Sequence, residues 1–247
     1  MGDMPASPHT ADPSTAAPGA DVLSKLGHEL RSPLTGIIGL TKILLTQLGV
    51  ADPARQARQL DMIQSSARQS LATIERVVDI ANLQSGRVEG DPRLIDCRGV
   101  VADAAATFAA AAQERGLRLR TDLPDHPVTV YADTAILTRT LRELLDNAVK
   151  FADPGEVVLH AGTDRGRPIV EVSDDGPGIP AGDQERIFEA FERGELAAER
   201  DDEGAGLGLY LARLLADRLG ACLSARSPAG RTTFTITFPD PDAVPRH

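Results

Sequence analysis

The segment 26–36, LGHELRSPLTG, combines a histidine, an acidic neighbour and a proline within one helical pattern. Glu29 follows His28, and its carboxylate can accept a hydrogen bond from one ring nitrogen and leave the other nitrogen as a nucleophile. Pro33 cannot donate the helical hydrogen bond to the Glu29 carbonyl, and its ring crowds that group. We therefore expect the helix to bend or loosen beside His28, at a cost of about 3 kcal/mol. A locally unfavourable residue beside a potential nucleophile is typical of a functional site.

Four separated segments in the second half of the chain contain residue types that suit a nucleotide and its metal ion. In the first, LRELLDNAVKF at 141–151, Glu143 and Asn147 are spaced i,i+4, share one helix face and are followed by Lys150. An amide oxygen suits Mg²⁺, and a lysine suits phosphate oxygens. An amphipathic helix with a polar outer face would show the same pattern, so this segment alone does not decide between the two.

The other three segments are rich in glycine or phenylalanine. In SDDGPGIP, residues 173–180, Asp174 can accept a hydrogen bond from the exocyclic amine of a purine, and two glycines permit close approach of the backbone. EGAGLGLYLAR, residues 203–213, places three glycines before a helix whose N-terminal amides and dipole favour phosphate. RIFEAFER, residues 186–193, predicts a short amphipathic helix with its isoleucine and phenylalanines packed inward. In isolation, the glycine segments also fit ordinary surface turns.

Two long helices are expected to carry the histidine. From 21 to 48, apolar residues recur in steps of four and three, which predicts an a/d seam over about four heptads. The sequence GVADP, residues 49–53, then supplies a helix stop and a turn, and a second seam runs from 60 to 81. Two antiparallel helices cannot bury both apolar stripes alone, so pairing with a second copy into a four-helix bundle is the simplest arrangement.

After Pro92 the pattern changes to alternating strands and helices. Helices are predicted at about 98–115, 133–151 and 207–219. GTDRGR is expected to join two of the strands as a hairpin. The predicted strands are Leu94–Cys97, Leu117–Leu123, Val128–Tyr131, Glu156–Ala161, Pro168–Ser173, Ala221–Ala225 and Thr232–Phe238. The predicted domains are a disordered tail at 1–20, a helical domain at 21–90, an α/β domain at 91–240 and a short tail at 241–247.

Composition limits the function classes. The net charge is −10, and residues 91–247 contribute −9 of it, which disfavours binding of nucleic acid. The sequence contains no run of about 18 apolar residues, so we expect no membrane-spanning helix. The N-terminus does not resemble a signal peptide. Cys97 and Cys222 are far apart and form no CxxC pair, so we expect two reduced cysteines in packing positions. Together these features predict a cytoplasmic location.

HELRSPLTGIIG resembles the phospho-acceptor box of two-component sensor histidine kinases. The segments ELLDNAVKF, DDGPGI, IFEAF and GAGLGL stand in the order of the N, G1, F and G2 boxes of the ATP-binding domain of that family. The resemblance covers about residues 21–239. It implies an α+β protein, in which an antiparallel helical hairpin forms a dimeric four-helix bundle. An ATP-binding α/β sandwich follows, with a mixed sheet covered on one face by helices.

The resemblance also implies an activity and its residues. ATP with Mg²⁺ would phosphorylate His28, and the phosphoryl group would pass to an aspartate on the receiver domain of a response regulator. The hydroxyl of Ser32 would help a water attack that phospho-aspartate, giving phosphatase activity toward the regulator. The implied catalytic residues are His28, Glu29, Ser32 and Glu143, and Asn147 would hold Mg²⁺. The implied nucleotide site is Asn147, Lys150, Phe151, Asp174, Gly176, Gly178, Gly204, Ala205, Gly206, Leu207, Gly208 and Leu209, under a mobile lid at 194–203.

Two other functions stay open. Many sensor kinases carry asparagine where this chain has Glu143, and others carry glutamate. In the related ATPases of type II topoisomerases, mismatch-repair proteins and heat-shock chaperones a glutamate here activates water, so Glu143 alone does not separate a kinase from an ATPase. An ATPase without phosphotransfer is therefore one alternative, and a dimeric scaffold or relay with a decayed nucleotide site is the other. The sequence does not indicate which stimulus would regulate such a kinase. The chain is either a small kinase driven by a separate sensor protein or the core of a longer one.

Overall fold

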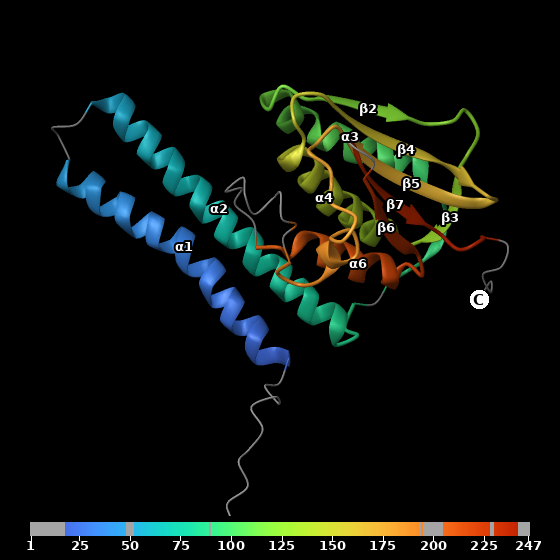
Figure 1. Ribbon diagram of the computed structural model, residues 1–247, viewed down its shortest axis with the longest axis horizontal. Coiled ribbons are helices and arrows are strands. Elements are labelled where there is room, and N and C mark those ends of the chain that lie inside the picture. Colours follow the sequence, from blue (N-terminus) through green and yellow to red (C-terminus); the bar gives the residue numbers. More distant parts are fainter. Residues whose placement is uncertain are drawn as a thin grey trace, which may run out of the picture. The chain divides into compact units, whose positions relative to one another are not determined.

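The computed structural model describes residues 18–47, 52–88, 90–192, 194, 205–227 and 230–241. The chain divides into two compact units, Met1–Ser66 and Ala67–His247 (Figure 1). In the described part of the chain, no helix has both the length and the apolar character needed to cross a lipid bilayer.

The first unit contains helix α1 (Pro18–Thr46) and the first part of helix α2 (Pro53–Gln84). These helices confirm the two predicted from the apolar seams. Helix α1 runs through Pro33 without interruption. Helix α2 begins at a proline, and the Asp52 side chain accepts a hydrogen bond from the Ala54 amide at 3.3 Å, as expected for the first turn of a helix.

The apolar stripes of the first unit are incompletely covered within one chain. On α1, Leu34 is 47% exposed and Leu45 is 64% exposed, and on α2 Leu60 is 57% exposed. Large apolar side chains exposed on both helices of a hairpin indicate a surface that another element covers.

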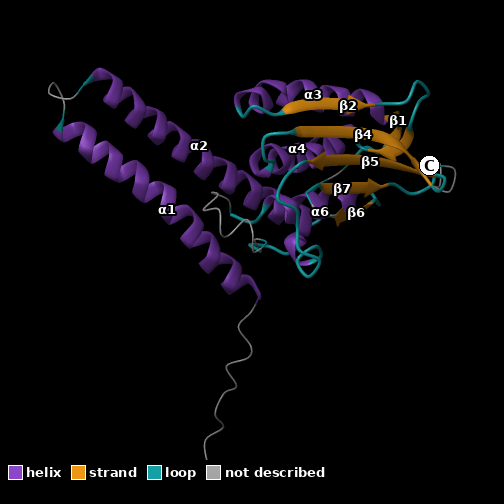
Figure 2. Cartoon of the chain, turned by 45° about the horizontal axis from the view of Figure 1, so that its top comes forward, coloured by secondary structure: helices purple, strands orange, loops and turns teal. Residues whose placement is uncertain are grey.

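The second unit is built on a mixed five-stranded sheet (Figure 2). The strand order is β2-β4-β5-β7-β6, in which β2 pairs parallel with β4 and the other neighbours are antiparallel. Helices α3, α4 and α6 lie on one face of this sheet, and a separate antiparallel pair, β1 and β3, adjoins it. The helices are α3 (Cys97–Glu114), α4 (Thr134–Phe151) and α6 (Gly208–Arg218). The strands are β1 (Arg93–Asp96), β2 (Arg118–Asp122), β3 (Thr129–Ala132), β4 (Glu156–Asp164), β5 (Arg167–Asp174), β6 (Cys222–Arg226) and β7 (Thr232–Thr237).

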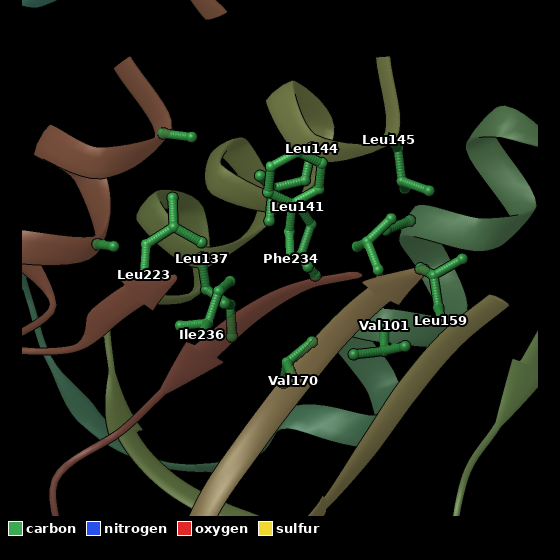
Figure 3. Packing of buried hydrophobic residues seen from close by; sticks show 14 of the residues in the cluster. Val101, Leu137, Leu141, Leu144, Leu145, Leu159, Val170, Leu223, Phe234 and Ile236 are labelled. Atoms are coloured by element: carbon green, nitrogen blue, oxygen red, sulfur yellow. The ribbon is translucent and has the colours of Figure 1, made fainter. Parts of the chain in front are cut away.

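The core lies between α4 and the sheet (Figure 3). Helix α4 has apolar residues at i, i+4, i+7 and i+8 spacing, which places them on one face. On β7, buried residues alternate with half-buried ones, so one face of that strand is covered. The fully buried side chains that meet there include Leu137, Leu141, Leu144, Leu145, Leu159, Val170, Leu223, Phe234 and Ile236. The predicted α+β fold with a one-sided helical layer is confirmed.

All seven predicted strands and the helices predicted at 98–115, 133–151 and 207–219 are present, with ends shifted by at most three residues. The hairpin between β4 and β5 is tighter than expected. Its strands continue to Asp164 and from Arg167, so only Arg165 and Gly166 form the turn, with φ of 48° and 81°. Positive φ at both central residues gives a turn whose twist matches that of the strands, and this allows the ladder to extend.

The prediction of a helix over 186–193 is wrong in its length. Only Arg186–Phe188 forms a short 3₁₀ helix, in which Ile187 and Phe188 are buried as expected. Phe191 is half-buried, has a φ of 65°, and donates its backbone N–H to the Gly206 carbonyl at 2.9 Å. That long-range hydrogen bond competes with continuation of the helix, and a local sequence pattern does not predict it.

Both cysteines are free thiols, as predicted. Cys97 is buried and Cys222 is exposed, so only the first is in a packing position. Burial raises the pKa of the Cys97 thiol to about 12, which keeps it protonated and unreactive.

Candidate functional site

The His28 side chain lies exposed on α1, in the first unit. Glu29 is half-buried beside it, and Ser32, one helical turn further along, is exposed. An exposed imidazole with an acidic neighbour is open to a second molecule from solvent.

The remaining predicted site residues belong to the second unit. Helix α4 begins after Asp133, whose carboxylate accepts hydrogen bonds from the amides of Ala135 at 2.8 Å and Ile136 at 3.1 Å. Three turns further on, the helix presents Glu143, which is 5% exposed, and then Asn147, which is half-buried.

The C-terminal end of α4 carries Lys150 and Phe151, both half-buried. The Lys150 Nζ lies 4.8 Å from the centroid of the Phe151 ring. This cation–π contact holds the Lys150 side chain at the end of α4 that faces the first glycine segment.

Asp174 ends strand β5 and is 3% exposed. Burial raises the pKa of this carboxyl to about 7, and the nearby charge of Asp175 adds to the rise. The Gly176 backbone N–H donates to Oδ1 of Asp174 at 3.0 Å and partly offsets the effect of burial. A Cβ on Gly176 would lie 2.5 Å from that oxygen and 3.2 Å from the Phe151 carbonyl. Only glycine therefore lets this segment approach the end of α4.

Gly178 has a φ of 85°, and a Cβ there would lie 2.9 Å from Oγ of Ser227. The same Oγ accepts a hydrogen bond from the Ile179 N–H at 2.7 Å and donates to the Arg231 carbonyl at 3.1 Å. The Arg231 guanidinium in turn contacts Asp175 at 2.9 Å. Two residues between β6 and β7 thus hold the glycine segment: Arg231 contacts it at Asp175, and Ser227 contacts it at Ile179. The sequence motifs gave no signal for Ser227 or Arg231.

The second glycine segment lies against the end of the 3₁₀ region. Gly206 has a φ of 62°, and a Cβ on it would come within 2.8 Å of the Glu192 carbonyl and 2.9 Å of the Phe191 Cα. Leu207 is buried, while Ala205 and Leu209 are half-buried. The predicted Gly204 and the expected lid residues 195–203 lie outside the described residues.

Gly208 begins helix α6, and no side chain among the described residues caps that end of the helix. Unpaired amides and the helix dipole make such an end favourable for phosphate. A Cβ on Gly208 would lie 3.3 Å from Oε2 of Glu143. The N-terminus of α6 therefore lies directly beside the predicted polar face of α4. The structure thus brings together the segments that contain Glu143, Asp174 and Gly208.

One contact of Glu143, with Arg76, was absent from the sequence predictions. Arg76, on the part of α2 that belongs to the second unit, donates from Nε to Oε2 of Glu143 at 2.8 Å. Its Nη2 donates to Oδ2 of Asp146 at 2.7 Å. Burial raises the pKa of Glu143, and the charge of Arg76 opposes that rise. For Arg76 itself, burial would lower the pKa, but the attraction of the two carboxylates outweighs it and the net shift is upward.

Comparison with known proteins finds two family matches. Residues 20–86 match the His Kinase A (phospho-acceptor) domain. Residues 132–242 match the family described as histidine kinase-, DNA gyrase B-, and HSP90-like ATPase. The first match contains the exposed histidine, and the second contains both glycine segments.

Curated relatives agree with these matches. The chain is 33% identical over 226 residues to the sensory/regulatory protein RpfC of Xanthomonas campestris pv. campestris, covering 88% of this chain and 31% of that protein. It is 34% identical over 228 residues to the aerobic respiration control sensor protein ArcB of Escherichia coli K12, covering 90% of this chain and 29% of ArcB. The chain therefore spans about a third of the length of these relatives. The sensor histidine kinase YcbM of Bacillus subtilis is 29% identical, over 88% of this chain and 70% of YcbM.

Solved structures share the fold. The Acinetobacter baumannii histidine kinase AdeS matches with a TM-score of 0.67 and 20% identity, over 87% of this chain and 98% of that one. Full-length ShkA in complex with AMPPNP matches with a TM-score of 0.64 and 27% identity, over 89% of this chain and 45% of ShkA. ThkA in complex with the response regulator TrrA matches with a TM-score of 0.69 and 18% identity, over 91% of this chain and 63% of that one.

Proposed function

We propose that this chain, which belongs to the two-component sensor histidine kinases and comprises a catalytic core of that family, uses ATP to phosphorylate His28. The phosphoryl group then passes to an aspartate on the receiver domain of a response regulator. The observation that carries this proposal is the combination of an exposed histidine in a phospho-acceptor domain with an ATPase domain whose N, G1 and G2 segments converge.

The first step is a substitution at phosphorus. The unprotonated ring nitrogen of His28 forms a bond to the γ-phosphorus while the bond to the β-phosphate oxygen of ADP breaks. Glu29 orients the imidazole and accepts its proton, which is released to solvent. Positioning and charge neutralisation lower the barrier, because little other chemistry is required of the protein.

The residues of the second unit fit an adenine nucleotide. The buried carboxylate of Asp174 is a suitable acceptor for the exocyclic amine, and glycine at 176 and 206 lets the two segments pack where a Cβ would collide with neighbouring atoms. We assign Lys150 and the uncapped N-terminus of α6 to the phosphates.

The residues also fit a magnesium ion that is shared with the substrate. In the ranges that the structure describes, no three His, Cys, Asp or Glu side chains are grouped closely enough to chelate a metal. We therefore assign the ion to the amide oxygen of Asn147 and to phosphate oxygens, which suits an ion that keeps several waters. When bound, Mg²⁺ neutralises charge on the β- and γ-phosphates.

Partners follow from the same proposal. We propose a homodimer in which the exposed apolar side chains of the helical hairpin, such as Leu34 and Leu60, form a four-helix bundle. The hydroxyl of Ser32 supports a phosphatase activity toward the regulator. A separate sensor protein, or further domains of a longer chain, would supply the stimulus. We propose a cytoplasmic location, because the reaction depends on ATP. We also propose 21–90 and 91–240 as the two functional domains.

Radiolabelling tests the proposal. Incubation with ATP labelled at the γ-phosphate should give a protein label that is stable in alkali and lost in acid. His28→Gln should abolish it, while the matched control His126→Gln should not. Label that persists in His28→Gln would overturn the assignment. Steady phosphate release without label would instead support an ATPase, and absence of binding by a fluorescent nucleotide would support a relay or scaffold.

A further inference from the structure

The contact between Arg76 and Glu143 joins a helix of the phospho-acceptor match to the N segment of the nucleotide site. The Arg76 side chain is 22% exposed and that of Glu143 is 5% exposed, so their 2.8 Å ion pair is largely removed from water. Asp146, which is 54% exposed, accepts a hydrogen bond from Nη2 of the same guanidinium. Arg76 therefore bridges two carboxylates that are three residues apart on α4.

Glu143 lies where it can affect phosphoryl chemistry. It is one helical turn before Asn147, and its Oε2 lies next to Gly208 at the N-terminus of α6. A buried carboxylate with a raised pKa beside a phosphate-binding helix end is a candidate general base for water. In a kinase this reactivity would waste ATP.

Building on the proposed function, we propose that Arg76 is a positioning residue that holds Glu143 as an ion-paired carboxylate and so prevents it from activating water against the γ-phosphate. The phosphoryl group is thereby kept for His28. The reaction that Arg76 suppresses is ordinary hydrolysis: a water oxygen bonds to the γ-phosphorus, the bond to ADP breaks, and Glu143 takes the water proton and releases it to solvent.

The ion pair suppresses hydrolysis in two ways. It occupies Oε2 of Glu143 with the Nε–H of Arg76, which competes with a water for that oxygen. It also stabilises the charged form and weakens the base, and loss of Arg76 would raise the pKa of Glu143 towards the working pH. The other charges that act on Glu143 are Asp146 and Arg142 of its own helix, which respectively raise and lower its pKa.

A matched control exists on the same two helices. The Arg139 guanidinium pairs with Asp79, and this contact joins α2 to α4 without involving Glu143. Ile80 and Leu83 of α2 also pack against the core of the second unit. Loss of Arg76 therefore leaves other contacts that hold this part of α2 in place, and a defect in packing alone would appear equally in Asp79→Asn.

The experiment measures phosphate release from ATP with Mg²⁺ in a His28→Gln background, where no acceptor histidine is present. Arg76→Gln should raise the release rate by about tenfold or more, since a general base contributes about 10²–10⁴-fold. Asp79→Asn should leave the rate unchanged, and addition of Glu143→Gln to Arg76→Gln should abolish the gain. Arg76→Lys keeps the charge but loses the two-donor contact, so its rate should fall between wild type and Arg76→Gln.

A second readout needs no nucleotide. Protein with ¹³C-labelled glutamate is titrated by NMR, and the carboxyl signal of Glu143 is identified by its loss in Glu143→Gln. This signal should titrate at higher pH in Arg76→Gln than in the parent protein. In Asp79→Asn it should titrate at the same pH as in the parent protein. A purely structural role for Arg76 would not produce this difference.

Three results would overturn the proposal: no rise in phosphate release with Arg76→Gln, an equal rise with Asp79→Asn, or a rise that survives Glu143→Gln. If Arg76→Gln does not fold, a wild-type rate in Arg76→Lys would overturn it. Labelling of the parent protein with His28 intact is run in parallel. Absence of histidine label there refutes the proposed kinase function, whereas normal label with unchanged hydrolysis refutes only the role of Arg76.

Discussion

Oδ1 of Asp174 accepts a hydrogen bond from the Gly176 backbone N–H at 3.0 Å, within a site where the carboxyl is 3% exposed. This hydrogen bond fixes the carboxyl at the end of β5. Because burial raises the pKa of Asp174 to about 7, its charge changes within the physiological range.

Nucleotide affinity should therefore depend on pH through Asp174. The ionised carboxylate is the stronger acceptor for an exocyclic amine, so affinity should fall as pH decreases from about 8 to 6. Asp174→Asn should bind about tenfold more weakly at pH 8 and lose most of this pH dependence. Titration with a fluorescent nucleotide at each pH measures it. An unchanged pH profile in Asp174→Asn would exclude Asp174 as its source.

The same carboxyl affects stability without nucleotide. Its native pKa of about 7 exceeds the ordinary 3.8, so the folded state binds more protons than the unfolded state between these values. Its contribution to the free energy of unfolding should therefore decrease as pH rises from about 4 to 7. Comparison of urea denaturation of wild type and Asp174→Asn over this range isolates the effect, and a wild-type minus variant difference that grows with pH would contradict it.

Gly206→Ala should disrupt the nucleotide site. It places a side chain at positive φ and within 2.8 Å of the Glu192 carbonyl, so we expect a loss of stability of about 1–3 kcal/mol together with weaker nucleotide binding. Gly166→Ala is the control, because Gly166 has a φ of 81° but nothing within 4 Å of its Cβ position. It should lose some stability by backbone strain and keep wild-type nucleotide affinity. Equal affinities in the two variants would show that Gly206 does not shape the site.

Ser227→Ala should loosen the first glycine segment. The substitution removes the acceptor for the Ile179 N–H and should cost about 1 kcal/mol of unfolding free energy, measured by urea denaturation. It should also weaken nucleotide binding, because the segment at Gly178 loses its support. Ser224→Ala, at an exposed position on β6, should change neither quantity. A stability loss without any loss of nucleotide affinity would separate Ser227 from the site.

Leu144→Ala should destabilise the second unit by about 2–5 kcal/mol, because the side chain is fully buried between α4 and the sheet. Leu94→Ala is the matched control, since Leu94 is 48% exposed, and it should cost less than about 1 kcal/mol. Thermal unfolding of both variants checks the difference. Similar values would mean that the core does not lie where Figure 3 places it.

The sequence predicted most of the fold because its signals are local. The heptad spacing on the two long helices predicts the helices themselves, and the alternation in strands such as Thr232–Thr237 reports directly which face of the strand is buried. Strand ends were less accurate. For example, Cys97 begins α3 instead of ending β1, because the Asp96 carboxylate accepts from the Arg98 amide and caps the helix.

The site was predictable only where motifs mark it. Glu143, Asp174 and the glycines lie in motifs whose order is informative, and the structure places these segments together. Arg76 and Ser227 act through contacts with residues 67 and 48 positions away, so no local pattern marks them. The hydrogen bond between Phe191 and Gly206, which follows the short helix Arg186–Phe188, is likewise a property of the folded chain.

Mass spectrometry can map the phosphoryl group after incubation with ATP and Mg²⁺ and digestion under alkaline conditions, and so decides whether His28 is the acceptor. We expect one phosphoryl group per chain, on the imidazole of His28, and none in His28→Gln. A phosphoryl group on Ser32 or Thr35, or an unmodified His28 in protein that hydrolyses ATP, would contradict it.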